Sequence, residues 1–377
     1  MKKILIIVGV VIGVPIILVA VVYFWFFSSF NKPAPAKPAQ TVDGVEDSNL
    51  AKSLNGLIVY DAPIGGIKGI SLPDLKEITI RKSSDGNDAV NAVSGVNKKG
   101  EIAFVDGNMN GKGEYSLKMI SSDGSGERTI FKKEGDPLWD HSMGSYLSLP
   151  QINSYVAFVG KMEGKDLKNP NEYLYVGPLE IWDTDKKAKI ASVDNALDVN
   201  FSWFPDGEKI AYTKMVPRDD LIKNKYVQEN EEDGVILKNY GDWSIVPAVF
   251  IYDVKNNSET FFHIGMSPIV SGDGKGIILN DKNYNQFLVD MNDSKKAIHI
   301  SWPGIWKDSF GFPNESTVIY MGLLTTGQTP RSTENNSPLV GAKNMLSVKV
   351  VDLRTGKFQT LIDYIDPRRN IGFGITN

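Results

Sequence analysis

The segment DGNMNGKGE, residues 106–114, offers the most specific chemistry in this sequence. Its side-chain oxygens recur at alternate positions, as they do in the first half of a loop that wraps a calcium ion. Such a loop ends in a bidentate glutamate at its twelfth position, where this sequence has Leu117. Asn-Gly is also a favourable hairpin turn, so a plain turn is the alternative. If calcium binds, the predicted ligands are Asp106, Asn108, Asn110, the backbone carbonyl of Lys112, and Glu114.

Groups for other chemistry are sparse. The chain has no cysteine and three histidines, which excludes thiol nucleophiles and thiolate metal sites and leaves little for a triad. Ser142 lies in DHSMG, which superficially resembles a nucleophile elbow. That motif needs glycine two residues before the serine, where this sequence has Asp140. We therefore expect no catalytic residues, and a protein that is not an enzyme.

Composition narrows the class of protein. The chain has 377 residues, and its 41 basic against 45 acidic residues give a net charge of −4. That balance disfavours a dedicated nucleic-acid binder, which needs a basic surplus for phosphate contacts. A hydrophobic content of 42% with 23% charged residues excludes wholesale disorder. The 35 glycines and 19 prolines are typical of a turn-rich β protein.

The N-terminal part of the sequence predicts a membrane anchor. Residues 4–27 carry no charge, and a helix of that length, at about 1.5 Å per residue, spans the bilayer core. The run is longer than the apolar core of a cleaved signal, which remains the alternative. Residues 1–3 are expected in the cytoplasm, and residues 28–55, rich in proline and alanine, form an extended linker. Residues 56–377 would then lie in the periplasm or at the cell surface.

Residues 56–377 repeat one pattern six times: a short alternating strand, a polar turn usually entered through Asp, and a second short strand. Clear copies are LEIWDTDKKAKIAS (179–192) and VFIYDVKNNSETFF (249–262). Alternation of period two indicates half-buried strands. An aspartate at the turn entry can accept hydrogen bonds from backbone N–H groups two residues further on. We predict this structural role for Asp183, Asp253, Asp290 and Asp352.

A second hairpin precedes each of these, most clearly FSWFPDGEKIAYT (201–213). Two hairpins make a four-stranded antiparallel sheet, and such sheets in series predict an all-β fold, the β-propeller. The first unit has only three strands, whereas IGFGITN (371–377) is one strand too many at the C-terminus. We expect this segment to complete the first blade. The prediction is a six-bladed propeller over 56–377, preceded by one transmembrane helix.

The segment FSWFPDGEKIAYT resembles the repeat of TolB-type propellers, with its Ser-x-aromatic strand, Pro-Asp-Gly, Lys and Ile-Ala-Tyr. The likeness extends over residues 56–377 in general pattern, but only this copy carries the whole motif. It implies a six-bladed propeller and leaves function open, because related blades serve envelope scaffolds, peptidases and sugar-active proteins. Sugar lyases on similar propellers use histidines and a metal near the axis, but His263 and His299 fall on predicted outermost strands.

The long insertions all fall between the second and third strands of their blades, at residues 161–178, 214–246 and 323–344. These connections emerge at one end of the fold, and loops on a rigid scaffold are where binding surfaces are built. Aromatic residues anchor many interfaces. The predicted binding face therefore carries Tyr226, Tyr240 and Trp243.

Together these features predict a membrane-anchored, extracytoplasmic propeller that binds an envelope protein or glycan through this face and binds no nucleic acid. The alternative is a propeller-fold enzyme, a lyase or hydrolase, that acts on polysaccharide. Calcium is the one cofactor that the sequence suggests.

Overall fold

The computed structural model of the chain divides it into two units, Met1–Ala39 and Gln40–Asn377. The structure describes residues 40–41, 46–62, 65–82, 88–108, 114–134, 146–160, 163–166, 173–197, 201–227, 237, 240–241, 243–283, 285–301, 306–314, 316–323, 346–365 and 371–374. The predicted membrane segment, 4–27, lies outside these residues. Within the described ranges, no helix has the length and apolar character needed to cross a membrane.

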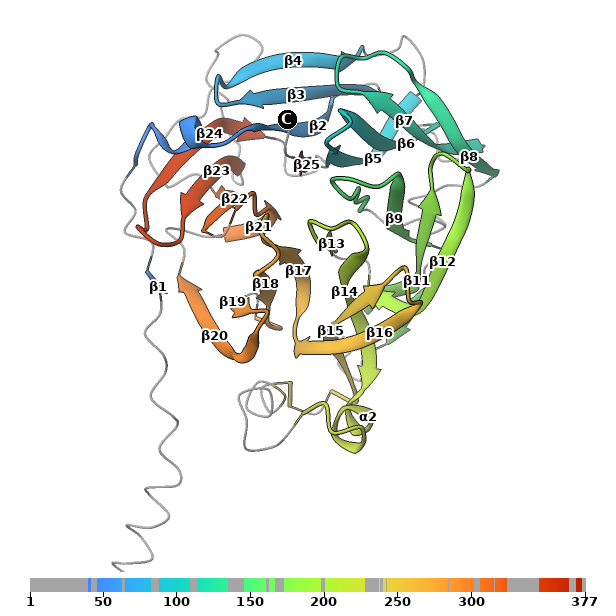
Figure 1. Cartoon of the computed structure of the whole chain (residues 1–377), viewed down its shortest axis with the longest axis vertical. Coiled ribbons are helices and arrows are strands. Elements are labelled where there is room, and N and C mark those ends of the chain that lie inside the picture. The colour runs from blue at the N-terminus through green and yellow to red at the C-terminus, as the bar shows by residue number, and fades with distance from the viewer. Residues whose placement is uncertain are drawn as a thin grey trace, which may run out of the picture. The chain divides into compact units, whose positions relative to one another are not determined.

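The second unit consists mainly of strands, as the alternating sequence pattern predicts. The strands form sheets that succeed one another around a common centre, with β25, β5, β13, β17 and β21 nearest to it (Figure 1). This is the radial arrangement of a β-propeller, in which each sheet buries its faces against its neighbours.

Three sheets have four strands each. The first contains, in spatial order, β25 (Ile371–Gly374), β2 (Gly56–Ala62), β3 (Gly66–Leu72) and β4 (Lys76–Arg81). The second contains β5 (Asp88–Val96), β6 (Glu101–Asn108), β7 (Glu114–Ser121) and β8 (Arg128–Glu134). The last along the chain contains β21 (Trp306–Gly311), β22 (Thr317–Leu323), β23 (Leu346–Asp352) and β24 (Phe358–Ile365).

The other two sheets are larger. One has five strands, in the order β1 (Gln40–Thr41), β20 (Asp293–Ser301), β19 (Gln286–Asp290), β18 (Gly276–Asn280) and β17 (Met266–Val270). The other has eight, of which six form the path β10 (Glu163–Asp166), β11 (Tyr173–Asp183), β12 (Ala188–Leu197), β14 (Lys209–Pro217), β15 (Ile245–Asp253) and β16 (Ser258–Ile264). β9 (Tyr155–Val159) pairs with β11, and β13 (Ser202–Trp203) pairs with β14.

The prediction of six separate four-stranded sheets is wrong, because the described strands form five sheets. The cause lies at the end of β12, where Ala196 pairs with Lys214 of β14. That single pairing joins two groups of strands into the eight-stranded sheet. Three sheets have the four strands that were predicted, and the all-β propeller fold itself is as predicted.

The C-terminal strand completes the first sheet. β25 pairs with β2 in antiparallel fashion, with Leu57 opposite Gly374 and Tyr60 opposite Ile371. Segment 371–377 was predicted to take this place, and its described part, Ile371–Gly374, does so. Two segments from opposite ends of the chain therefore share one sheet, and the pairing leaves no free strand edge at the inner side of β2.

Part of the predicted linker, 28–55, packs on the propeller. β1 pairs in parallel with β20. Further on, Glu46 forms a parallel bridge with Phe358 of β24, and the 3₁₀ helix η1 (Leu50–Ser53) follows. We call residues 46–54 the strap. Composition suggested a free linker here, but the apolar residues Ala51 and Leu54 are buried and attach this stretch to the sheets.

The turn aspartates act as predicted. Asp183 Oδ1 accepts hydrogen bonds from the backbone N–H groups of Asp185 and Lys186, at 3.0 and 2.9 Å. The other three, Asp253, Asp290 and Asp352, each accept a bond from an N–H two or three residues ahead, at 2.9, 2.8 and 3.0 Å. Each aspartate thereby fixes the turn between the third and fourth strands of its sequence repeat.

Candidate interaction surface

The connection between β14 and β15 forms a small helical insertion. α2 (Arg218–Lys223) follows Pro217, which stands at its N-cap, and Asp219 and Asp220 lie in its first turn. Negative charge there is favourable because the N-terminal N–H groups of a helix carry partial positive charge. α2 lies outside the ring of sheets, beyond β15 and β16 (Figure 1).

A Schellman motif ends α2. Lys225 adopts the left-handed conformation, with φ of 58°. Its N–H donates to the carbonyl of Ile222 at 3.0 Å, and the N–H of Tyr226 donates to that of Leu221 at 3.0 Å. These are the two bonds that define this helix end. The motif fixes the direction in which the chain leaves the helix, and so the position of Tyr226.

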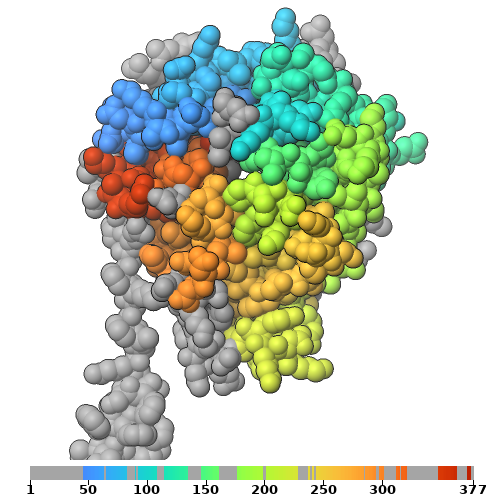
Figure 2. All heavy atoms as spheres, in the orientation of Figure 1, coloured from blue at the N-terminus to red at the C-terminus, as the bar shows by residue number. Residues whose placement is uncertain are grey.

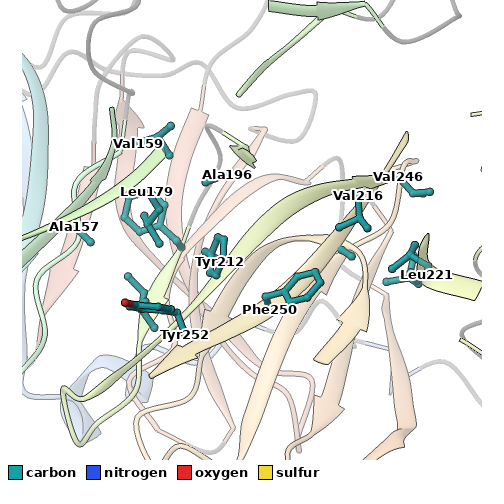
Figure 3. Packing of buried hydrophobic residues seen from close by; sticks show 14 of the residues in the cluster. Ala157, Val159, Leu179, Ala196, Tyr212, Val216, Leu221, Val246, Phe250 and Tyr252 are labelled. Atoms are coloured by element: carbon teal, nitrogen blue, oxygen red, sulfur yellow. The ribbon is translucent and has the colours of Figure 1, made fainter. Parts of the chain in front are cut away.

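The inner side of the insertion is part of a large apolar cluster. Leu221 is fully buried and lies near Val216 and Val246, in the cluster that also contains Phe250 (Figure 3). The remaining buried members from the insertion are Val227, Leu237 and Tyr240. The described part of the insertion is therefore attached to the sheet by its own apolar residues.

The outer side presents two large apolar side chains to solvent. Ile222 is 43% exposed and Tyr226 is 41% exposed. The Tyr226 ring stacks on Phe261 of β16, with centroids 5.0 Å apart and planes 13° apart. It meets the edge of Phe250 at 6.1 Å. Tyr226 is thus held in one orientation while much of its surface stays open.

Basic residues neighbour Ile222 and Tyr226 along the chain. Arg218 Nη1 donates to the carbonyl of Gly241 at 2.5 Å, which ties the start of the insertion to its end. Lys223 and Lys225 are exposed. On β16, the Glu259 carboxylate accepts hydrogen bonds from the Tyr212 hydroxyl and the Lys214 ammonium, both at 2.5 Å. Burial, with Glu259 beside it, raises the pKa of Tyr212, which therefore stays a neutral donor.

Only one of the three predicted aromatic anchors, Tyr226, is exposed. Tyr240 is 1% exposed, so its prediction as a surface anchor is wrong; it packs in the core, and burial raises its pKa. Trp243 is half-buried, meets Tyr240 at 5.3 Å and packs near Val176 and Leu197. Tyr226 is exposed, as a surface anchor must be, and its role in binding stays a prediction. Sequence reasoning missed Ile222, because it follows Leu221 directly and the sequence does not show which of the two apolar residues faces solvent.

The predicted calcium segment is described only at its ends. Asn110 and Lys112 lie outside the described residues, whereas Asn108 ends β6 and Glu114 begins β7. Glu114 Oε1 accepts a hydrogen bond from Lys132 Nζ at 2.6 Å. Calcium binding stays a prediction for this turn.

The Asp106 carboxylate already has cationic partners. It accepts bonds from Arg81 Nη2 at 3.0 Å and from Lys118 Nζ at 2.6 Å. Burial lowers the pKa of Lys118, but its bonds to Asp106 and Glu127 raise the pKa by more. A calcium ion would have to displace these two cations. Within the described ranges, no three His, Asp or Glu side chains converge as metal ligands.

The histidines occupy outer strands where the structure describes them. His263 lies on β16, the last strand of its sheet, as predicted, whereas His299 lies on β20, which has β1 outside it. His263 is buried, and its Nδ1 lies 2.7 Å from the carbonyl oxygen of Ile264. His141 and Ser142 fall outside the described residues.

The other two predicted insertions differ in what can be seen of them. In the first insertion, β10 pairs in antiparallel fashion with the beginning of β11, and Glu163 stands opposite Val176. The third insertion, apart from residue 323, lies outside the part of the chain that the structure describes. The surface around Tyr226 is therefore the best defined of the three.

Solved structures share this architecture. The crystal structure of TolB from Acinetobacter baumannii matches 85% of this chain and 67% of its own, with 13% sequence identity and a TM-score of 0.53. The chain has a β-propeller fold similar to that of TolB. A structure assigned to TolB from Agrobacterium tumefaciens matches 86% of this chain and 99% of its own at 13% identity, with a TM-score of 0.46.

An oligogalacturonate lyase from Vibrio parahaemolyticus matches 68% of each chain at 11% identity, with a TM-score of 0.42. No family model matches the sequence, and no curated protein matches it. Likeness at these identities extends to the fold and not to the activity.

Proposed function

We propose that this chain is a membrane-anchored propeller outside the cytoplasm that binds a protein or glycan of the cell envelope. Residues 4–27 would hold it in the membrane with the N-terminus in the cytoplasm. We count the eight-stranded sheet as two blades joined by one residue pair, which gives six blades. The fold likeness to TolB supports an envelope role without specifying the ligand.

The observation that carries the proposal is that Tyr226 and Ile222 are both exposed, whereas Leu221 and Val227 of the same insertion are buried in the apolar cluster. An aromatic ring that is already ordered loses little conformational entropy on binding. Aromatic residues with a dry surround dominate the energy of many interfaces. Here Phe261 and Phe250 hold the ring, and the exposed lysines 223 and 225 would form a polar rim.

The test uses the full-length chain in detergent, immobilised and exposed to membrane and cell-wall fractions. Tyr226→Ser combined with Ile222→Ser should reduce capture of a specific component at least tenfold, about the loss of one strong contact. Ile190→Ser is the matched control, because Ile190 is 40% exposed on a different part of the chain. Equal capture by both variants would show that these residues of the insertion do not take part in binding.

The alternative function is cleavage of an envelope polysaccharide. It has a separate readout in the same experiment, since a lyase or hydrolase releases new chain ends from a purified glycan. If the variant with Tyr226→Ser and Ile222→Ser still releases new chain ends, the protein is an enzyme whose active site lies elsewhere on the propeller.

A further inference from the structure

Each sequence repeat ends in an outer strand, which is the fourth strand of that repeat. The backbone N–H and C=O groups along the far edge of such a strand can pair with another chain, and proteins commonly guard the edge with lysine. Four of the outer strands contain a lysine or an arginine: β4, β8, β12 and β20. The other two contain neither, namely β16 with the sequence SETFFHI and β24 with the sequence FQTLIDYI.

The strap covers one of these two strands, β24. Glu46 forms a parallel bridge with Phe358, and the N–H of Asp47 donates to the Phe358 carbonyl at 2.7 Å. The N–H of Ala51 donates to Gln359 Oε1 at 2.8 Å. Figure 2 shows blue residues of the strap lying against red residues of the last sheet. A segment of the same chain thus covers an edge that no lysine guards.

The N-terminal part of the chain also extends β20. Gln40 and Thr41 of β1 pair in parallel with Ile300 and Ser301 at the end of that strand. The outer edges of two sheets therefore accept an added segment through strand pairing. Other proteins bind extended peptides in the same way, with the peptide joining the edge of a sheet as a further strand.

The other strand without lysine or arginine, β16, has a bare edge in the part of the chain that the structure describes. It stands last in the strand order of its sheet. Among the described residues, no backbone hydrogen bond joins Ser258–Phe261 to a segment other than β15. Ser258, Glu259 and Thr260 are exposed. The carboxylate of Glu259 is paired with Lys214, so it is not a free charge at this edge.

The exposed Tyr226 lies next to this strand. Its ring stacks on Phe261 of β16 with the centroids 5.0 Å apart. In Figure 2 the gold surface of β15 and β16 borders the yellow-green surface of the insertion. Side chains of a strand alternate between the two faces of a sheet. A strand added to β16 would therefore place every second side chain on the face that carries Phe261 and Tyr226.

We propose that the outer edge of β16, along Ser258–Phe261, is the docking site for an extended peptide segment of a partner protein, which joins the sheet as a further strand. The inference rests on the proposed binding surface around Tyr226 and deepens it, because it names a peptide and not a glycan as the ligand. Backbone hydrogen bonds hold the segment to the edge, and a large apolar side chain that packs on Tyr226 and Phe261 selects its sequence. The segment carries no proline where its N–H must face β16.

The test exposes the full-length protein in detergent to a library of synthetic peptides of about eight residues, slightly longer than a typical strand. The tightest binder serves as the probe, and each of its backbone nitrogens is methylated in turn. A strand at a sheet edge directs every second N–H toward its neighbour. Methylation should therefore weaken binding about tenfold at alternate positions, the loss of one or two hydrogen bonds, and have little effect between them. The bound probe should also slow hydrogen exchange in Ser258–Phe261.

A variant of the protein tests the same edge from the other side. Thr260→Lys gives β16 the kind of guard that β4 and β8 carry, and it should weaken binding of the probe about tenfold, because the added charge must lose water when a strand pairs there. Ser192→Lys is the matched control, since Ser192 is an exposed residue on the outer strand β12. It should leave binding of the probe unchanged. Thermal unfolding of both variants checks that the fold is intact, and the methylation series needs no variant.

Three results would overturn the proposal: no peptide of the library binds, methylation acts without the alternating pattern, or Thr260→Lys binds the probe as well as the unchanged protein does. A purified envelope glycan distinguishes this failure from failure of the proposed function. If the glycan binds, and Tyr226→Ser with Ile222→Ser abolishes its binding, the surface around Tyr226 is a binding surface and the peptide inference is wrong. If these variants alter the binding of neither probe, both proposals are wrong.

Discussion

Gly372 of β25 packs directly on Gly95 of β5: a Cβ atom at position 372 would lie 2.2 Å from the Gly95 backbone nitrogen. The same strand, β25, pairs with β2 through antiparallel hydrogen bonds. β25 therefore completes the first sheet and contacts the inner strand of the second. The close approach of these backbones depends on the absence of side chains at both positions.

This contact predicts that Gly95→Ala and Gly372→Ala each destabilise the protein by about 1–3 kcal/mol or more, the cost of overpacking against backbone that cannot move. Gly241→Ala is the control, because Gly241 has a φ of 55° and a Cβ atom there would have no other atom within 4 Å. Its cost should be limited to backbone strain, about 1–2 kcal/mol. Denaturant unfolding measures all three, and near-neutral values at 95 and 372 would contradict the packing.

Removal of residues 371–377 should have a larger effect than either glycine variant. The truncated chain loses the pairing of β25 with β2. The inner edge of β2 and the backbone of β5 around Gly95 then become exposed. Free strand edges promote association between molecules. We expect aggregation or a large fall in Tm, measured by light scattering and calorimetry. An unchanged Tm in a monomeric truncated protein would mean that β25 does not close the ring.

The closing strand was predictable because the first repeat has only three strands in the sequence, whereas segment 371–377 is an additional strand after the last repeat. The turn aspartates were predictable because their role is local. The joined sheets were not, since the pairing of Ala196 with Lys214 depends on how far β12 extends. Nor was the burial of Tyr240, because an aromatic residue in an insertion can pack inward or outward. The strap was obscured by the proline-rich segment just before it.

Asp106 should contribute to stability through its two cations. Asp106→Asn leaves Arg81 and Lys118, at 14% and 20% side-chain exposure, short of a counter-charge. The expected loss is about 1–3 kcal/mol, equal in EDTA and in millimolar calcium. Thermal unfolding in both buffers measures it. A rise in Tm with calcium that Asp106→Asn abolishes would support the predicted calcium loop in place of this ion pair.

The turn aspartates predict loss of stability in acid. Burial raises the pKa of Asp183, but hydrogen bonds from the backbone and ammonium of Lys186 lower it by more, so the pKa lies below its usual value of 3.8. A bond from the Asn256 N–H lowers the pKa of Asp253. A carboxyl group with a depressed folded-state pKa contributes stability above its unfolded pKa and loses it as pH falls through the folded value.

The unfolding free energy should therefore begin to fall below about pH 4. Asp183→Asn keeps an acceptor oxygen but cannot ionise, so it should flatten part of this decline. Asp183→Ala should lower stability at neutral pH as well. Denaturant titrations from neutral pH down to about pH 3 measure these effects, and an identical acid slope in Asp183→Asn would show that Asp183 is not involved.

The central claim, that the surface around Tyr226 binds an envelope component, is tested most directly by photo-crosslinking in intact cells. A photoreactive residue is placed at position 226, 222 or 190 of the full-length protein, and the envelope fraction is analysed for adducts. We predict a discrete adduct from 226 and 222 and none from 190. An adduct from 190 with none from 226 or 222 would contradict the account.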